Sequence, residues 1–219
     1  MPRRRDPNWA AIDPHLADYI DALANRGGEA LASIEETGLR DDWPIVGAAE
    51  GSFLFILAKA LGARRILELG TAIGYSGTWY ARALPPDGQL ITVEADPETA
   101  KIAEANLERT GVRGRVTVLV GPAQEVLEDL EGPFDLIFVD INKEGYPEVL
   151  DPCIRRLRVG GLLVTDNVLW RGDVADPKDR SRDTAAIRTY NERLANDPRM
   201  IASILPLRDG VSVALKLHD

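Results

Sequence analysis

The sequence predicts an α/β protein with a mostly parallel sheet of seven strands, which ends in an antiparallel hairpin and is preceded by extra helices. From residue 64 onward, short apolar runs alternate with helical stretches, as in βα units that form a parallel sheet. Near the end, two strand-like runs are separated only by residues 206–210. This connection is too short for a crossover helix, so the last two strands must pair antiparallel.

Five apolar runs are expected to form the parallel strands. Several are continuously apolar, such as Ile137-Phe138-Val139, which is typical of strands that helices cover on both faces. The expected strands are residues 65–69, 90–94, 116–120, 136–139 and 162–165, followed by the hairpin strands 200–205 and 211–217. The expected intervening helices are residues 76–84, 97–110, 124–130 and 146–157.

The length of 219 residues suits one domain of roughly 200 residues better than two. We expect a flexible tail over residues 1–12, a helical cap over 13–61 and a Rossmann-like core over 64–219. Apolar residues recur at helical spacing within the cap. Gly27-Gly28 and the segment 41–44 divide the cap into separate helices.

Composition and charge exclude several classes of function. The single cysteine, Cys153, allows no intramolecular disulfide, and its apolar neighbours predict a buried structural thiol. The two histidines, His15 and His218, lie near the chain ends, so a zinc site or a Ser-His-Asp triad is poorly supported. The net charge of −9 disfavours nonspecific nucleic-acid binding. No apolar run reaches the ~18 residues of a membrane span, and no signal peptide is visible, so we expect a cytoplasmic enzyme.

The end of the first strand predicts a cofactor loop. Ligands of parallel α/β sheets bind at the carboxyl ends of the strands. Gly70 and Gly74 have the spacing G-x-x-x-G, not the G-x-G-x-x-G of dinucleotide binding. Glu68 would repel a pyrophosphate but suits a ligand with an ammonium and a sulfonium, such as S-adenosylmethionine. The alternative is an ordinary βα turn without a ligand.

The second and third strand ends fit the rest of such a ligand. Glu94 follows Gly74 by about 20 residues, the spacing at which an acid accepts hydrogen bonds from ribose hydroxyls. The alternative is a solvated acid. Asp96-Pro97 is better explained as a helix N-cap and first helical residue. After the third strand, small residues such as Ala123 leave room for an adenine ring.

The fourth and fifth strand ends predict a metal site. Asp140 follows one strand and Asp166-Asn167 follows the next, so their oxygen atoms should lie together at one edge of the sheet. Oxygen ligands without Cys or His suit Mg²⁺, Mn²⁺ or Ca²⁺. The alternative for Asp166-Asn167 is a common polar turn. Lys143 is a candidate base if its pKa falls near the metal, although a lone loop lysine is usually a surface group. Trp170 is either an aromatic wall for a planar acceptor or a packing residue.

Together, these residues resemble the family of catechol and caffeoyl-coenzyme A O-methyltransferases and their bacterial relatives. The resemblance extends from about residue 46 to residue 216. Its specific segments are ILELGTAIGYS (66–76), FVDINK (138–143), TDNVLW (165–170) and LPLRDG (205–210). The resemblance implies the Rossmann-like methyltransferase fold and a reaction in which a methyl group moves from S-adenosylmethionine to a vicinal aromatic hydroxyl.

The resemblance also assigns residue roles. It implies that Asp140, Asp166 and Asn167 hold a divalent metal, most readily Mg²⁺, and that Lys143 is the catalytic base. It places the following residues at the cofactor: the backbone of Val46, together with Glu68, Gly70, Thr71, Ser76, Glu94, Ala123 and Asp140. Family members are commonly homodimers whose N-terminal helices help to cover the site.

Two departures and two alternative functions accompany this resemblance. Ile141-Asn142 replaces the alanine and second acid of many relatives, and Ser52 replaces a glutamine. Some bacterial relatives methylate a hydroxylated uridine in the tRNA anticodon, a function that requires a basic face. The basic candidates here are residues 3–5 and the following four, which are interleaved with acids: Lys178, Arg180, Arg182 and Arg188. A noncatalytic cofactor-binding module is the other alternative, but it leaves the metal ligands and Lys143 without a role.

Overall fold

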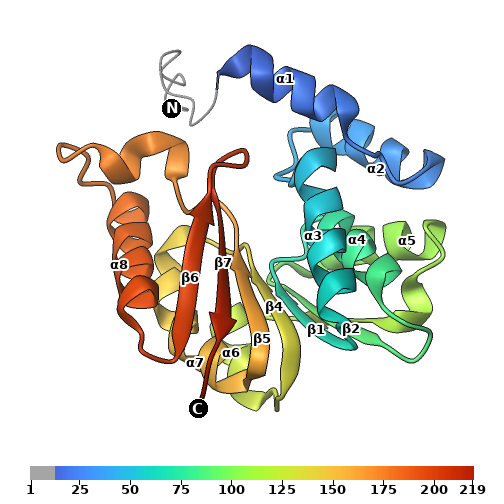
Figure 1. The fold of residues 1–219 in the computed structure, drawn as a ribbon. Coiled ribbons are helices and arrows are strands. Elements are labelled where there is room, and N and C mark those ends of the chain that lie inside the picture. The colour runs from blue at the N-terminus through green and yellow to red at the C-terminus, as the bar shows by residue number, and fades with distance from the viewer. Residues whose placement is uncertain (1–12) are drawn as a thin grey trace.

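The computed structural model describes residues 13–219, which form a seven-stranded sheet with helices on both faces (Figure 1). The expected tail, residues 1–12, lies outside the described residues. The strand order is β3-β2-β1-β4-β5-β7-β6. The strands are β1 (Arg65–Leu69), β2 (Gln89–Glu94), β3 (Val116–Val120), β4 (Phe134–Val139), β5 (Leu157–Thr165), β6 (Met200–Leu205) and β7 (Val211–Lys216).

The mixed topology of the sheet confirms the predicted α/β class and the closing hairpin. Strands β1 to β5 pair in parallel, whereas β7 pairs antiparallel with both β5 and β6. The hairpin is inserted with its second strand innermost, so β7 lies beside β5 and β6 forms the edge. The connection between β6 and β7 is thereby brought to the same end of the sheet as the carboxyl end of β5.

Helices cover the two faces of the sheet in separate layers (Figure 1). The layer that includes the N-terminal helices consists of α1 (Pro14–Leu23), α2 (Glu29–Arg40), α3 (Gly47–Leu61), α4 (Tyr75–Ala83) and α5 (Pro97–Arg109). The opposite layer consists of α6 (Ala123–Asp129), α7 (Tyr146–Arg156) and α8 (Arg182–Asn196). None of the helices within residues 13–219 has the length and apolar character that crossing a bilayer requires.

The continuously apolar strands are covered by helices on both faces, as the sequence predicted. Successive side chains of a strand point to opposite faces, so a strand between two helical layers must be apolar at every position. In β4, Phe138 packs in the hydrophobic cluster with α3 and α4, whereas Ile137 and Val139 pack in the cluster with α7. All three side chains are fully or almost fully buried.

Two local expectations are confirmed at helix and core positions. Asp96 caps α5 because its carboxylate accepts a hydrogen bond from the Thr99 amide at 2.7 Å, and Pro97 occupies the first turn. Cys153 is buried on α7, and burial raises the pKa of its thiol to about 12. It is therefore an inert structural thiol at neutral pH.

Two features differ from the expectations. Strand β5 begins at Leu157, five positions earlier than expected, because Leu157 already pairs with Phe134 before a register irregularity in the β4–β5 ladder. Helix α8 was not expected at all. Its buried residues Ile187, Tyr190 and Leu194 recur at helical spacing, and Ser181 caps its start, so the signal was present in the sequence.

Candidate active site

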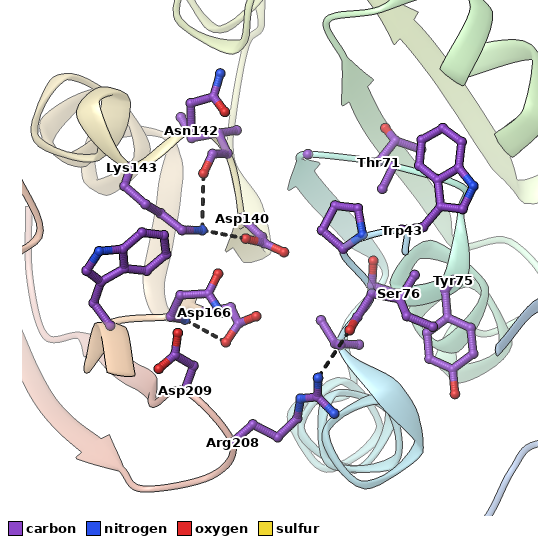
Figure 2. A pocket seen from close by; sticks show the side chains of 18 of the residues that line it. Trp43, Thr71, Tyr75, Ser76, Asp140, Asn142, Lys143, Asp166, Arg208 and Asp209 are labelled. Carbon is purple, nitrogen blue, oxygen red and sulfur yellow. Dashed lines mark hydrogen bonds and ion pairs between the residues drawn. The ribbon is translucent and has the colours of Figure 1, made fainter. Parts of the chain in front are cut away.

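A cleft of about 1300 Å³ lies at the carboxyl ends of the parallel strands (Figure 2). Among the residues proposed for cofactor, metal and catalysis, all but one line it. The lining members of that set are Val46, Gly70, Thr71, Ser76, Glu94, Ala123, Asp140, Lys143, Asp166 and Asn167. The exception is Glu68. Trp170 and Arg208 also line the cleft, as do residues of α1 at its mouth.

In the loop after β1, Gly70 is required by the packing of the loop against the end of β4. Gly70 has a φ of +101°, and a side chain there would meet the backbone carbonyl of Asp140. The loop is therefore locked against the end of β4, where the Asp140 amide donates to the Leu69 carbonyl at 2.8 Å. Gly74, with a φ of +81°, starts α4. The two glycines thus fix the distance between the cofactor loop and Asp140.

Glu68 lies behind this loop and not on the cleft surface. Its side chain is fully buried, and Oε2 accepts a hydrogen bond from the Thr92 hydroxyl at 2.6 Å, while Oε1 has no partner among residues 13–219. Burial raises its pKa to about 7, although the hydrogen bonds from Thr92 and Ser76 act in the opposite direction. Strand alternation explains the position, because the Glu68 side chain points toward α4, where Gly77 faces its Oε2. Glu68 is therefore not a lining side chain, and its role toward the cofactor stays a prediction.

Glu94 lines the cleft and also organises the cofactor loop. Its Oε2 accepts a hydrogen bond from the Ala72 amide at 2.9 Å, and its Oε1 accepts one from the Asp96 amide at 3.1 Å. Each carboxylate oxygen keeps a further acceptor position. Ala72 has a φ of +45°, so this hydrogen bond holds a strained residue of the loop. Glu94 is thus already oriented before any ligand binds.

The metal half of the cleft combines the ends of β4 and β5. Val139 and Thr165 are directly paired, so Asp140 and Asp166 follow at the same level of adjacent strands (Figure 2). Asp140 Oδ1 accepts from Lys143, and Asp166 Oδ1 accepts from the Asn167 amide at 2.6 Å. Within the described part of the chain, no hydrogen bond reaches Asp140 Oδ2, Asp166 Oδ2 or Asn167 Oδ1. Three oxygen atoms therefore remain available at this edge.

The electrostatics of this pair favour a cation. Burial and the neighbouring Asp140 carboxylate raise the pKa of Asp166 to about 7, against the opposing charge of Lys143. Two carboxylates this close repel each other unless a positive charge lies between them. Across residues 13–219, no three acidic, histidine or cysteine side chains converge to hold an ion. The assignment of Asp140, Asp166 and Asn167 as metal ligands stays a prediction.

Lys143 is a buried lysine and not a surface group. Its Nζ donates hydrogen bonds to Asp140 Oδ1 at 2.8 Å, to the Ile141 carbonyl at 3.2 Å and to the Tyr146 hydroxyl at 2.7 Å. Its side chain is 9% exposed and faces the cleft (Figure 2). Trp170 lies beside it, with its ring centroid 5.7 Å from Nζ, and also packs against the core. The packing role considered for Trp170 is therefore present, and its role as an aromatic wall stays a prediction.

Three residues of the site were not identified from the sequence. Tyr146 accepts from Lys143 and donates to the Asp166 carbonyl at 3.0 Å. Arg208, at the tip of the β6–β7 hairpin, donates to the Ile45 carbonyl at 3.4 Å and faces Glu50 with 3.7 Å between Nε and Oε2. Glu50 is fully buried on α3. Tyr146 follows Lys143 by three residues, and Arg208 lies within the segment LPLRDG (205–210). These two positions are the features of the sequence from which both residues could have been proposed.

Both departures from the family pattern are accommodated locally. Ser52 is half-buried and donates to the Ala49 carbonyl at 2.9 Å within its own helix, and it does not line the cleft. Ile141 and Asn142 line the cleft beside Lys143, whose position they do not disturb. The ammonium contacts of Lys143 are made to Asp140, Tyr146 and the Ile141 backbone, and none requires a second acid at position 142.

Known proteins share both the sequence and this arrangement. The O-methyltransferase family matches residues 25–217. A catechol O-methyltransferase from Niastella koreensis is 35% identical over 94% of the chain and 97% of the relative. One from Mycobacterium tuberculosis is 44% identical over 80% of the chain and 81% of the relative. The crystal structure of the O-methyltransferase TomG from Streptomyces achromogenes, in complex with S-adenosylmethionine, matches with a TM-score of 0.83, 35% identity and coverage of 96% and 97%.

A parallel sheet closed by an inserted hairpin, with acids at the β4 and β5 ends, defines the class of methyltransferases predicted above. The chain belongs to the O-methyltransferase family that includes the catechol and caffeoyl-coenzyme A enzymes. The predicted resemblance and the predicted fold are therefore confirmed. The individual roles of the site residues stay predictions.

Proposed function

We propose that the protein transfers a methyl group from S-adenosylmethionine to one of two adjacent hydroxyls on a small aromatic acceptor, with the help of a divalent cation. The observation that carries this proposal is the junction of the β4 and β5 ends. There, Asp140, Asp166 and Asn167 leave three oxygen atoms available beside the buried Lys143. The relatives named catechol O-methyltransferase support the acceptor class.

The residues present fit an Mg²⁺ or Mn²⁺ ion, and Ca²⁺ has the same preference for oxygen. Hard oxygen donors are what these ions prefer, and Mg²⁺ takes one or two carboxylates while keeping other positions for water or substrate. The raised pKa of Asp166 reflects a repulsion that such a cation would relieve. A bound ion would supply Lewis-acid chemistry, which would lower the pKa of the acceptor hydroxyl that reacts.

The residues of the chain supply positioning and proton transfer. Lys143 takes the hydroxyl proton at Nζ, and the resulting ammonium is stabilised by Asp140 Oδ1, the Ile141 carbonyl and the Tyr146 hydroxyl. Trp170 provides a flat wall for the aromatic ring. Glu94 holds the ribose, and the negative charge of Glu68 favours the cationic methyl donor. The acceptor oxygen then attacks the methyl group in line as the bond from carbon to sulfur breaks, and S-adenosylhomocysteine leaves as a neutral thioether. The reaction depends mostly on positioning.

The tRNA alternative has less support in the arrangement of basic residues. Arg188 is not available to phosphates, because its guanidinium bonds four backbone carbonyls of the segment before α8, at Asp173, Val174, Asp176 and Asp179. Lys178, Arg180 and Arg182 are exposed. Residues 3–5 lie outside the described residues.

Labelled-methyl transfer separates these acceptors. The full-length protein is incubated with methyl-labelled S-adenosylmethionine and Mg²⁺, with a panel of catechols in one set and hypomodified tRNA in another. Matched phenols with a single hydroxyl serve as controls. We expect label in catechols and not in the matched phenols. Label in tRNA, with none in any catechol, would replace the proposed acceptor by the anticodon uridine.

We also propose a homodimer, as expected from the resemblance. Helix α1 carries Leu16, Tyr19 and Leu23 at helical spacing, with exposed fractions of 48%, 61% and 68%. Large apolar side chains that gather on one exposed helix face are typical of a protein interface. Light scattering on the purified protein tests this proposal, and a monomer mass at micromolar concentration would contradict it.

A further inference from the structure

Glu50 is a buried carboxylate without a hydrogen bond. Its side chain is fully buried, and neither Oε1 nor Oε2 has a hydrogen-bond partner in the structure of residues 13–219. A buried polar group without a partner is costly, and a buried charge more so. Arg208 is the nearest cation, but the 3.7 Å between its Nε and Oε2 is too long for a hydrogen bond.

The surroundings of Glu50 direct it toward the metal half of the cleft. Glu50 belongs to the first turn of α3, whose neighbouring residues Val46 and Ala49 line the cleft. The Asp166 and Asp140 carboxylates are close enough to raise the pKa of Glu50, with burial as the largest cause. Glu50 does not complete a direct three-carboxylate site with them. Glu50 is therefore a neighbour of Asp166 that lies outside the set of direct ligands.

Arg208 and Gly47 both contribute to the surroundings of Glu50. The Arg208 side chain extends from the hairpin tip toward the start of α3 (Figure 2). There it faces Glu50 and donates to the Ile45 carbonyl. A side chain at Gly47 would lie 2.6 Å from Arg208 Nη1, so the glycine leaves room for the guanidinium. The charge of Arg208 offsets that of Glu50 but leaves the lone pairs of Glu50 free to accept hydrogen bonds.

We propose that Glu50 is an outer-sphere residue of the metal site, which accepts hydrogen bonds from water molecules that hydrate the ion held by Asp140, Asp166 and Asn167. This inference rests on the proposed metal dependence and adds a fourth side chain, from the N-terminal helical layer, to the site. Mg²⁺ and Mn²⁺ keep ordered waters that donate such hydrogen bonds. Glu50 thereby couples the helical cap to the metal, with Arg208 as its counter-ion.

Titration of Mn²⁺ into the metal-free protein, followed by calorimetry, tests the proposal without any measurement of activity. We expect Glu50→Gln to weaken Mn²⁺ binding by ~10–100-fold, the usual effect of losing an outer-shell partner. Glu50→Asp keeps the charge but withdraws the oxygens, so it should give a smaller loss. Glu50→Asp also provides the test of Mn²⁺ binding if the glutamine variant does not fold. Affinity for S-adenosylhomocysteine should stay at the parent value in both variants.

The matched control is Glu35→Gln. Glu35 is also a buried glutamate, and it bonds the Ala48 amide at 3.1 Å at the start of the same helix, but it pairs with Arg26 and not with the metal half. Its Mn²⁺ affinity should equal that of the parent. If the Glu50 variants bind Mn²⁺ as tightly as the parent and only lose stability, Glu50 is a structural residue of the helical layer and the proposal is wrong. If the parent itself binds no Mn²⁺, the proposed metal dependence fails as well.

Discussion

The hydroxyl of Tyr146 connects Lys143 to Asp166, because it accepts a hydrogen bond from Lys143 Nζ at 2.7 Å and donates one to the Asp166 carbonyl at 3.0 Å. The lysine after β4 is thereby fixed relative to the carboxylate after β5. The Tyr146 ring packs edge-on against Tyr190, which keeps the hydroxyl in place. The proposed base and the proposed metal ligands are consequently parts of one hydrogen-bonded unit.

Tyr146→Phe should therefore lower turnover more than it lowers cofactor affinity. The change removes an acceptor from Lys143 and a donor from the buried Asp166 carbonyl, and one such loss costs ~1–3 kcal/mol. We expect kcat to fall by about tenfold or more. Tyr190→Phe is the control, because its hydroxyl pairs with Thr165 and does not touch Lys143. Equal kcat values in the two variants would show that Tyr146 only packs.

Lys143→Ala should lower turnover by ~10²–10⁴-fold, the contribution of a positioned general base. Binding of S-adenosylmethionine, measured by calorimetry, should change little, because all the proposed cofactor contacts except Asp140 come from other segments. Lys101→Ala is the matched control, since Lys101 is 68% exposed and pairs only with Glu98. A Lys143 variant that methylates a catechol at the parent rate across neutral pH would remove the lysine from the mechanism.

Glu94→Ala should weaken S-adenosylmethionine binding by ~1.5–3 kcal/mol for each ribose hydrogen bond lost. The loop bonds to Ala72 and Asp96 are lost in the same variant. Glu94→Gln keeps the loop bond to Ala72 and separates the two effects. Glu98→Ala, at an exposed position nearby, should bind like the parent. An unchanged affinity of the Glu94 variants by calorimetry would refute the ribose assignment.

Removal of divalent metal should abolish activity, and added Mg²⁺ or Mn²⁺ should restore it. Asp166→Ala should lose activity in the same way while still binding S-adenosylmethionine, because Asp166 lies in the metal half of the cleft. Asp87→Ala, which removes an exposed carboxylate, is the control. Full activity in excess chelator, with metal analysis showing an empty site, would leave Lys143 to activate the acceptor alone.

The ionisation of Glu68 should make stability depend on pH. Burial raises its pKa from 4.5 to about 7, so between these values the folded protein holds a proton that the unfolded chain releases. This contribution is fully present below pH 4.5, is lost as the pH rises through about 7, and amounts to roughly 3 kcal/mol. Glu68→Gln should not show it. Denaturant unfolding of both proteins from pH 5 to 8 gives the difference, and parallel curves would contradict the assignment.

The sequence by itself determined the order of the strands and of most helices along the chain, and the position of the proposed metal ligands. Apolar periodicity is a local property, and parallel strands end at one edge of the sheet, so Asp140, Asp166 and Asn167 had to come together. The spacing after β6 likewise required a hairpin. Helix α8 carries the same kind of local signal, because Ile187, Tyr190 and Leu194 recur at helical spacing.

Tertiary structure alone decided the depth of each side chain and the contacts between distant segments. Nothing local set the Asp140 carbonyl against Gly70. Nor did any pattern bring Arg208, from the hairpin tip, to Glu50 at the start of α3. Such contacts depend on how a helical layer packs on the sheet, which the sum of many side-chain volumes fixes and no single segment encodes.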